Sequence, residues 1–214
     1  MPYVPKWGKG TKGFKVSNVW IGKEYFELVR MKTKDGGGWV KDWVQKYHAG
    51  HRGLIGLAID MENIDEMYEK ILQCGIEITK PESLQFKCFF NLFTKTMPWK
   101  NAYVQPMAGM PFQFFLQQMK DQKSREYMEK YMYPNSQENK INGIVEVKIY
   151  GELTNQDREI MECLFSDITH EKEETIIQLG YQCIRFIQSP NHFVEVLLDC
   201  ENIKESKYRL RMYY

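Results

Sequence analysis

The chain of 214 residues has almost no net charge, no long apolar run and no leader segment. Lysine and arginine number 29 and aspartate and glutamate 28, so the net charge at pH 7 is +1. This balance gives no electrostatic reason to expect nucleic acid or an anionic membrane as a partner. No stretch of about 18 apolar residues is present, and no basic segment precedes an apolar one. The sequence therefore predicts a cytoplasmic protein that has no membrane segment.

Cysteine usage is sparse and unpaired. The chain has five cysteines, an odd number, and no CxxC or Cys/His zinc pattern, so a disulfide framework is not expected. Each of them lies among apolar neighbours, which predicts small buried hydrophobic side chains. They are Cys74, Cys88, Cys163, Cys183 and Cys200.

Familiar catalytic motifs are missing as well. The sequence has no G-x-S-x-G elbow, no P-loop spacing and no HExxH zinc motif. It also offers no motif for an organic cofactor, and none is expected.

The clearest pattern that is present runs from Gly53 to Met119. An apolar run over 54–59 predicts a buried strand. Asn63 and Glu66 then predict a capped helix, which Gly75 ends. The apolar residues of this helix recur at helical spacing, which predicts one buried stripe. Three further strands are predicted at 84–94, 102–107 and 112–119.

The same order recurs towards the C-terminus. Alternating apolar residues over 145–149 predict a strand, and Thr154 with Asp157 predicts the capping box of a helix whose buried stripe reaches Ile168. Three strands are then predicted at 175–179, 181–188 and 192–199. The chain thus contains an internal repeat of strand, helix, strand, strand, strand at a spacing of about 90 residues.

An α+β fold of repeated βαβββ modules is the resulting prediction. Ahead of the repeats, strands at 14–21 and 24–30 predict a hairpin around Gly22, and Trp39 and Trp43 lie at helical spacing. The predicted organisation is an N-terminal arm, hairpin and short helix (1–48), a βαβββ module plus a helix (49–133), a linker (134–142) and a second βαβββ module (143–214).

Three short motifs in the N-terminal part resemble a known family. Gly10-Thr11, Ser17-Asn18 and the run Tyr25–Val29 are similar to the "GT…N…YLEL" stretch of the glyoxalase-like branch of the vicinal oxygen chelate (glyoxalase/bleomycin resistance/dioxygenase) superfamily. The resemblance implies curved, mostly antiparallel sheets whose paired modules enclose a cleft. Relative to that branch, the first strand and helix of the N-terminal module are missing.

The resemblance also implies a site for a divalent metal, whose identity stays open. Glu27 and Glu195 match closing-strand carboxylates and are the expected catalytic residues. Glu146 is the expected third metal ligand. Such an ion polarises substrate oxygens while a carboxylate moves a proton. As an alternative, these glutamates lie on the solvent-exposed face of strands that are buried on their other face.

Three kinds of function remain open. The first is a metal-dependent lyase, isomerase or dioxygenase-type enzyme acting on a small oxygenated molecule. The second is a non-catalytic protein that binds a small molecule in the same cleft, and the third is an interaction module without a ligand. A homodimer is also expected, because an incomplete N-terminal module exposes sheet edges and apolar side chains. The expected pocket residues are Asn18, Trp20, Tyr25, Trp39, Trp43 and Trp99.

Overall fold

The computed structural model describes residues 13–22, 24–88, 93–110, 112–126, 141–200 and 208–213. The fold is α+β, with more strand than helix and with both antiparallel and mixed sheets. The chain forms two compact units, each built from separate segments. The first unit comprises Met1–Gly53, Met128–Lys148 and Phe193–Tyr214, and the second comprises Leu54–Tyr127 and Ile149–His192.

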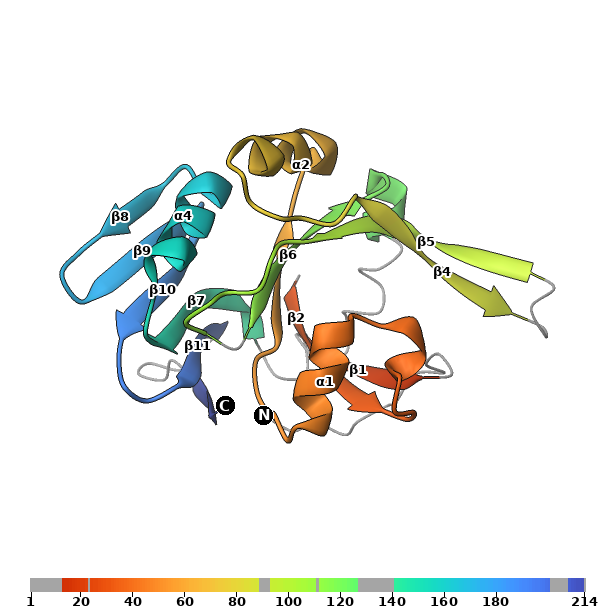
Figure 1. Ribbon diagram of the computed structural model, residues 1–214, viewed down its shortest axis with the longest axis horizontal. Coiled ribbons are helices and arrows are strands. Elements are labelled where there is room, and N and C mark those ends of the chain that lie inside the picture. Colours follow the sequence, from red (N-terminus) through yellow and green to blue (C-terminus); the bar gives the residue numbers. More distant parts are fainter. Residues whose placement is uncertain are drawn as a thin grey trace. The chain divides into compact units, whose positions relative to one another are not determined.

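A hairpin and a short helix open the first unit (Figure 1). Strands β1 (Phe14–Ile21) and β2 (Glu24–Met31) pair in antiparallel fashion, as the alternating pattern predicts. Gly22 has a positive φ of 59°, the conformation that a tight turn needs at this point. The short 3-10 helix η1 (Gly36–Gly38) leads to α1 (Lys41–His48).

Helix α1 packs against one end of the hairpin. Val44 of α1, together with Phe14 and Met31, forms a buried apolar cluster. Partly buried side chains surround this cluster, namely Val16, Val29, Trp39 and Tyr47.

The remaining strands of the first unit follow the order β12-β11-β7. Strand β7 (Ile141–Gly151) passes from the first unit into the second, whereas β11 (Phe193–Cys200) and β12 (Tyr208–Tyr213) are antiparallel partners. The hairpin turn is tied to the start of β7, because the Glu24 carboxylate accepts a hydrogen bond of 3.1 Å from the backbone N–H of Ile144. A Cβ atom at Gly22 would lie 1.8 Å from the carbonyl oxygen of Asn142, so only glycine fits there.

The first module of the second unit has the predicted strand, helix, strand, strand, strand order. Its elements are β3 (Gly56–Asp60), α2 (Ile64–Gln73), β4 (Glu82–Cys88), β5 (Phe93–Tyr103) and β6 (Gln113–Met119). The sheet order is β3-β6-β5-β4, in which β3 runs parallel to β6 and the other pairs are antiparallel.

Two strand boundaries in this module were predicted wrongly. The run 84–94 spans the end of β4 and the start of β5, and the run 102–107 is not a separate strand. Val104 makes only an isolated bridge to Ile78, and Met107 lies beyond it. Both side chains are buried. The apolar run at 102–107 therefore reflects the burial of a loop between strands and not a strand of its own.

The second module has the same order, but its strands differ from the predicted ones. The three-residue strand β8 (Ile168–His170) was not predicted, and the strand predicted at 192–199 (β11) lies in the first unit. The end of β7 is followed by α4 (Asn155–Leu164), and β10 (Gln182–Gln188), β9 (Glu174–Leu179) and β8 (Ile168–His170) continue the sheet in that order. The predicted helical stripe was wrong beyond Leu164. Phe165 is already extended (φ −118°, ψ 139°), and Ile168 pairs with Ile177 in the sheet.

Other predictions fall largely outside the described residues. The helix expected at 124–133 is described only at its beginning, where residues 122–126 are helical, and most of the linker at 134–142 is not described. The predicted ranges 1–48, 49–133 and 143–214 therefore stay a prediction about modules. No helix of the described residues is long and apolar enough to span a membrane.

Aromatic packing joins the two modules inside the second unit. Phe112 and Phe114 of the first module contact Phe186 at ring-centroid distances of 6.2 and 6.3 Å, and Phe114 also contacts Phe165 at 5.6 Å. All four rings are buried.

A buried carboxylate makes a second connection between the modules. Asp157 is fully buried and forms the predicted capping box with Thr154. Its oxygens also accept hydrogen bonds from the backbone N–H groups of Ala108 (2.6 Å) and Gly109 (2.9 Å). A Cβ atom at Gly109 would lie 2.0 Å from the carbonyl oxygen of Glu152, so the close approach requires glycine.

The expectation of five unpaired cysteines was wrong for two of them. Cys74, the C-cap residue of α2, forms a disulfide with Cys163 in the last turn of α4. The two residues are 89 positions apart, and only the packing of α2 against α4 brings them together. Cys183 and Cys200 form no disulfide and are partly buried.

We expect Asp157→Ala to lower the free energy of unfolding by about 3 kcal/mol, because several donors lose a charged acceptor in a buried place. Urea denaturation of the two proteins measures the difference. Glu159→Ala removes an exposed carboxylate from the same helix and serves as the control, with an expected change of less than about 0.5 kcal/mol. Equal losses in the two variants would contradict the assigned role of Asp157.

Candidate functional site

One face of the β1–β2 hairpin gathers several of the predicted site residues. Directly opposed residues of an antiparallel pair project to the same face. The register therefore stacks four pairs along this face: Phe14 with Met31, Val16 with Val29, Asn18 with Glu27, and Trp20 with Tyr25. The Asn18–Glu27 pair is thus a polar step between apolar neighbours.

The side chain of Asn18 has an unsatisfied acceptor. Its Oδ1 atom is buried and has no hydrogen-bond partner. Leaving a buried acceptor unpaired costs about 1–3 kcal/mol, and such groups are rare in folded proteins. Functional sites are one place where this cost is tolerated.

The carboxyl group of Glu27 lies opposite this amide. Desolvation by the surrounding protein raises the pKa of Glu27 above its usual range, although part of the residue remains exposed to solvent. A raised pKa makes the carboxyl group a better proton acceptor once ionised and a hydrogen-bond donor when protonated.

Aromatic side chains lie on both sides of the polar step. The rings of Trp20 and Tyr25 are 4.7 Å apart on one side. On the other side, Phe14 stacks on Trp39 at 5.0 Å, and Trp39 meets Trp43 edge-on at 4.9 Å. Trp43 is buried, so at least this tryptophan serves the packing of α1.

The other predicted site residues have different surroundings. Glu195 in β11 is 5% exposed and has interaction partners. Glu146 in β7 forms an ion pair of 3.4 Å with Lys148. Trp99 lies in β5, in the second unit, and is partly buried.

No group of three or more His, Cys, Asp or Glu side chains in the described part of the chain is arranged to hold a metal ion. The structure therefore does not gather Glu27, Glu146 and Glu195 into one three-ligand group. Their assignment as metal ligands stays a prediction.

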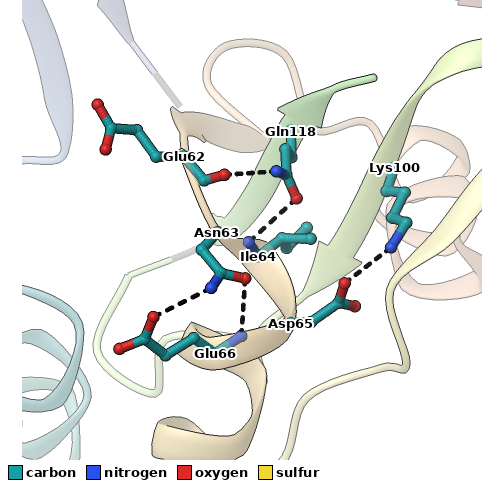
Figure 2. Close-up of polar contacts among 7 residues, drawn as sticks. All are labelled: Glu62, Asn63, Ile64, Asp65, Glu66, Lys100 and Gln118. Atoms are coloured by element: carbon teal, nitrogen blue, oxygen red, sulfur yellow. Dashed lines mark hydrogen bonds and ion pairs between the residues drawn. The ribbon is translucent and has the colours of Figure 1, made fainter. Parts of the chain in front are cut away.

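The start of α2 is a second polar cluster, shown in Figure 2. Asn63 accepts a hydrogen bond of 3.2 Å from the backbone N–H of Glu66, and its amide nitrogen donates to the Glu66 carboxylate at 3.0 Å. The Gln118 amide bridges the same turn, donating to the carbonyl oxygen of Glu62 and accepting from the N–H of Ile64. These contacts satisfy backbone groups at the start of the helix, so the cluster acts as a cap.

A third cluster was not predicted from the sequence. Arg158 donates to the Thr175 hydroxyl at 3.0 Å, and this hydroxyl is 3.1 Å from Nδ1 of His170. The other ring nitrogen of His170 is 3.0 Å from the Glu162 carboxylate. A carboxylate, an imidazole and a hydroxyl linked in this order resemble the arrangement that activates a catalytic nucleophile. Thr175, however, is 1% exposed, so substrate has no access to its hydroxyl. In the sequence, only the spacing of Arg158 and Glu162 could have indicated this cluster, because residues four apart lie on one face of a helix.

The second unit also contains a cavity of about 190 Å³. Its wall is mainly apolar, with an aspartate, a serine and a glutamine among the lining residues. They are Ile59, Asp60, Met61, Leu116, Leu164, Phe165, Ser166, Gln178 and Leu179. The Asp60 carboxylate is already paired with Arg125 at 2.9 Å.

We expect the stability difference between the parent protein and Glu27→Gln to depend on pH. The pKa of Glu27 is raised in the folded state, so its protonated form favours folding. This contribution is present below the unfolded-state pKa of about 4.3 and is lost as the pH rises through the folded-state pKa. The parent protein should therefore lose stability relative to Glu27→Gln between pH 4 and pH 7, as measured by urea midpoints.

Glu69→Gln, at an exposed position of α2, is the control for the loss of one charge. A Glu27→Gln difference that stays constant with pH would contradict the role of desolvation.

Comparisons with known proteins report on the fold alone. No protein-family model matches the sequence, and no curated protein matches it. Among solved structures, this chain is similar to one described as the crystal structure of a hypothetical protein from Staphylococcus aureus. The two share 15% identity with a TM-score of 0.67, over 94% of this chain and 84% of that one. At this level of identity, the similarity shows a shared fold and leaves the activity open.

Proposed function

We propose that this chain is a glyoxalase-like protein of the vicinal oxygen chelate type, and that it binds a small molecule on the Asn18–Glu27 face of the β1–β2 hairpin. The observation that carries the proposal is the buried Oδ1 atom of Asn18, which lacks a hydrogen-bond partner. A ligand that brings a donor group to this atom removes the desolvation cost of the unpaired acceptor.

The neighbouring groups suit a ligand that is partly polar and partly apolar. Glu27 offers a second polar contact directly across from Asn18, and its chemistry changes with protonation. Trp20 and Tyr25 supply an aromatic flank. A small number of polar groups within an apolar lining is the usual composition of a small-molecule site.

The fold supports the proposal independently of these side chains. Each module follows the strand, helix, strand, strand, strand order that the resemblance implies. Asn18 and Glu27 also belong to the short motifs on which the resemblance rests.

A second candidate is metal-dependent lyase, isomerase or dioxygenase-type chemistry at the same face. The side-chain amide oxygen of Asn18 and the carboxylate of Glu27 are hard oxygen ligands of the kind that divalent cations prefer. A bound cation would polarise the oxygens of a small substrate. Glu195 or Glu146 would have to complete the ligand set, and Glu146 would first have to leave its ion pair with Lys148.

Asn18→Leu is expected to separate stability from binding. Without ligand, the variant should be more stable than the parent by about 1 kcal/mol, because a side chain with an unpaired buried oxygen is replaced by an apolar side chain of similar size. In a thermal-shift screen with small oxygenated molecules and divalent metals, compounds that raise the melting temperature of the parent should have no effect on the variant.

Asn101→Leu is the matched control, because both ends of the Asn101 amide are hydrogen-bonded in β5. This variant should be less stable than the parent. Stoichiometric metal in the purified parent, absent from Glu27→Ala, would favour the enzyme over the metal-free binder. The proposal fails if Asn18→Leu is destabilised like Asn101→Leu and keeps every ligand response of the parent.

We also propose that the chain forms a homodimer. Within the part of the chain that the structure describes, β1 and β2 form a sheet of two strands, and such small sheets are only marginally stable alone. A second copy that covers the hairpin edge would complete the sheet. Light scattering at micromolar concentration should give about twice the chain mass of 25.5 kDa, and a monomer would contradict the proposal.

A further inference from the structure

We propose that Cys74 and Cys163 form a reversible redox centre, which exchanges with low-molecular-weight thiols and disulfides through Cys74 and thereby locks or releases helices α2 and α4. The proposal does not depend on the small-molecule site, which lies in the other compact unit.

The two helices hold the cysteines at bonding distance. Cys74 is the C-cap of α2 and Cys163 lies in the last turn of α4, and the two helices are in contact. The Cα atoms are 6.6 Å apart, which is within the range that a disulfide spans. The bond therefore forms between helices that already lie in the right place.

The two cysteine residues differ in exposure. Cys74 is exposed, whereas Cys163 is 6% exposed. A Cβ atom built at the next residue, Gly75, would have no neighbour within 4 Å, so there is open space beside Cys74. We therefore expect an attacking thiol to react at Cys74 rather than at Cys163.

Exchange then follows a balanced sequence. A small thiolate attacks Sγ of Cys74, a mixed disulfide forms there, and Sγ of Cys163 leaves as a thiolate that takes a proton from water. A second small thiolate attacks the small-molecule sulfur of the mixed disulfide, and Cys74 leaves and is protonated. In total, two small thiols become one small disulfide while the protein gains two thiols, and a small disulfide reverses the reaction.

The fold also accommodates the reduced state. Sγ of Cys163 lies 3.9 Å from the carbonyl oxygen of Lys70, which can accept a weak hydrogen bond from the thiol. Cys74 faces water once it is released. Since both states have partners, this disulfide is suited to switching as well as to cross-linking.

The cross-link has consequences for the second unit. It joins residues 89 positions apart, one from each module, so it restricts the unfolded chain strongly. Leu164 and Phe165, which directly follow Cys163, line the cavity of about 190 Å³. Oxidation thus fixes one wall of this cavity.

The test is alkylation of the native full-length chain, read by mass spectrometry, after equilibration in buffers with varied ratios of reduced to oxidised glutathione. We expect Cys74 and Cys163 to be protected together in oxidising buffer and alkylated together in reducing buffer, while circular dichroism stays unchanged. Reduction should lower the melting temperature of the parent by roughly 5–15 °C. The melting temperature of Cys74→Ser should not respond to reductant.

Trapping of the mixed disulfide distinguishes the two sulfurs. Oxidised glutathione should add one molecule to Cys74 of Cys163→Ser and none to Cys163 of Cys74→Ser. Cys183→Ser, which removes a cysteine outside the disulfide, should show the same redox response as the parent. The proposal is overturned if both thiols are free in oxidising buffer, or if the parent disulfide is reduced only after the chain unfolds. The measurements on the parent decide the matter even if a serine variant fails to fold.

Discussion

Contact between phenylalanine rings from distant parts of the chain is the interaction on which the second unit depends. Phe112 and Phe114 end one module, and Phe165 and Phe186 belong to the other. Neither module can bury these rings alone, and leaving them in water would forfeit about 1.5–3 kcal/mol for each. The Asp157 carboxylate then fixes the orientation, because its hydrogen bonds to Ala108 and Gly109 require one relative placement of helix and loop.

In the first unit, a polar pair, Asn18 and Glu27, lies between apolar pairs of the hairpin. Helix α1 covers the Phe14 end of the hairpin, and the aromatic pair of Trp20 and Tyr25 occupies the other end. Asn18 and Glu27 lie between them, one with an unpaired buried oxygen and the other with a raised pKa. The unpaired buried oxygen of Asn18 is the feature that stability alone does not explain, so this part of the hairpin is the place to look for function.

Local signals explain which elements were predicted correctly. Helices α2 and α4 carry their own caps, Asn63 and Thr154, and a periodic apolar stripe, so their existence needs no distant partner. Strand β8 was missed because it has only three residues and exists through its pairing with β9. Asn18 and Glu27 are opposed in the hairpin, as strand alternation predicts, whereas the glutamates of β7 and β11 do not join them in a three-ligand group. The functional roles assigned to these residues stay predictions.

The sequence by itself determined the α+β class, helices α2 and α4 and the residues that share each face of the β1–β2 hairpin, because periodicity and capping act over a few neighbouring residues. Only the tertiary structure decided the Cys74–Cys163 disulfide, the burial of Phe112 against Phe186 and the isolation of the Asn18 oxygen. Each of these depends on groups brought together by packing or by strand register. No local sequence pattern specifies which distant side chain contacts a given atom in the folded protein.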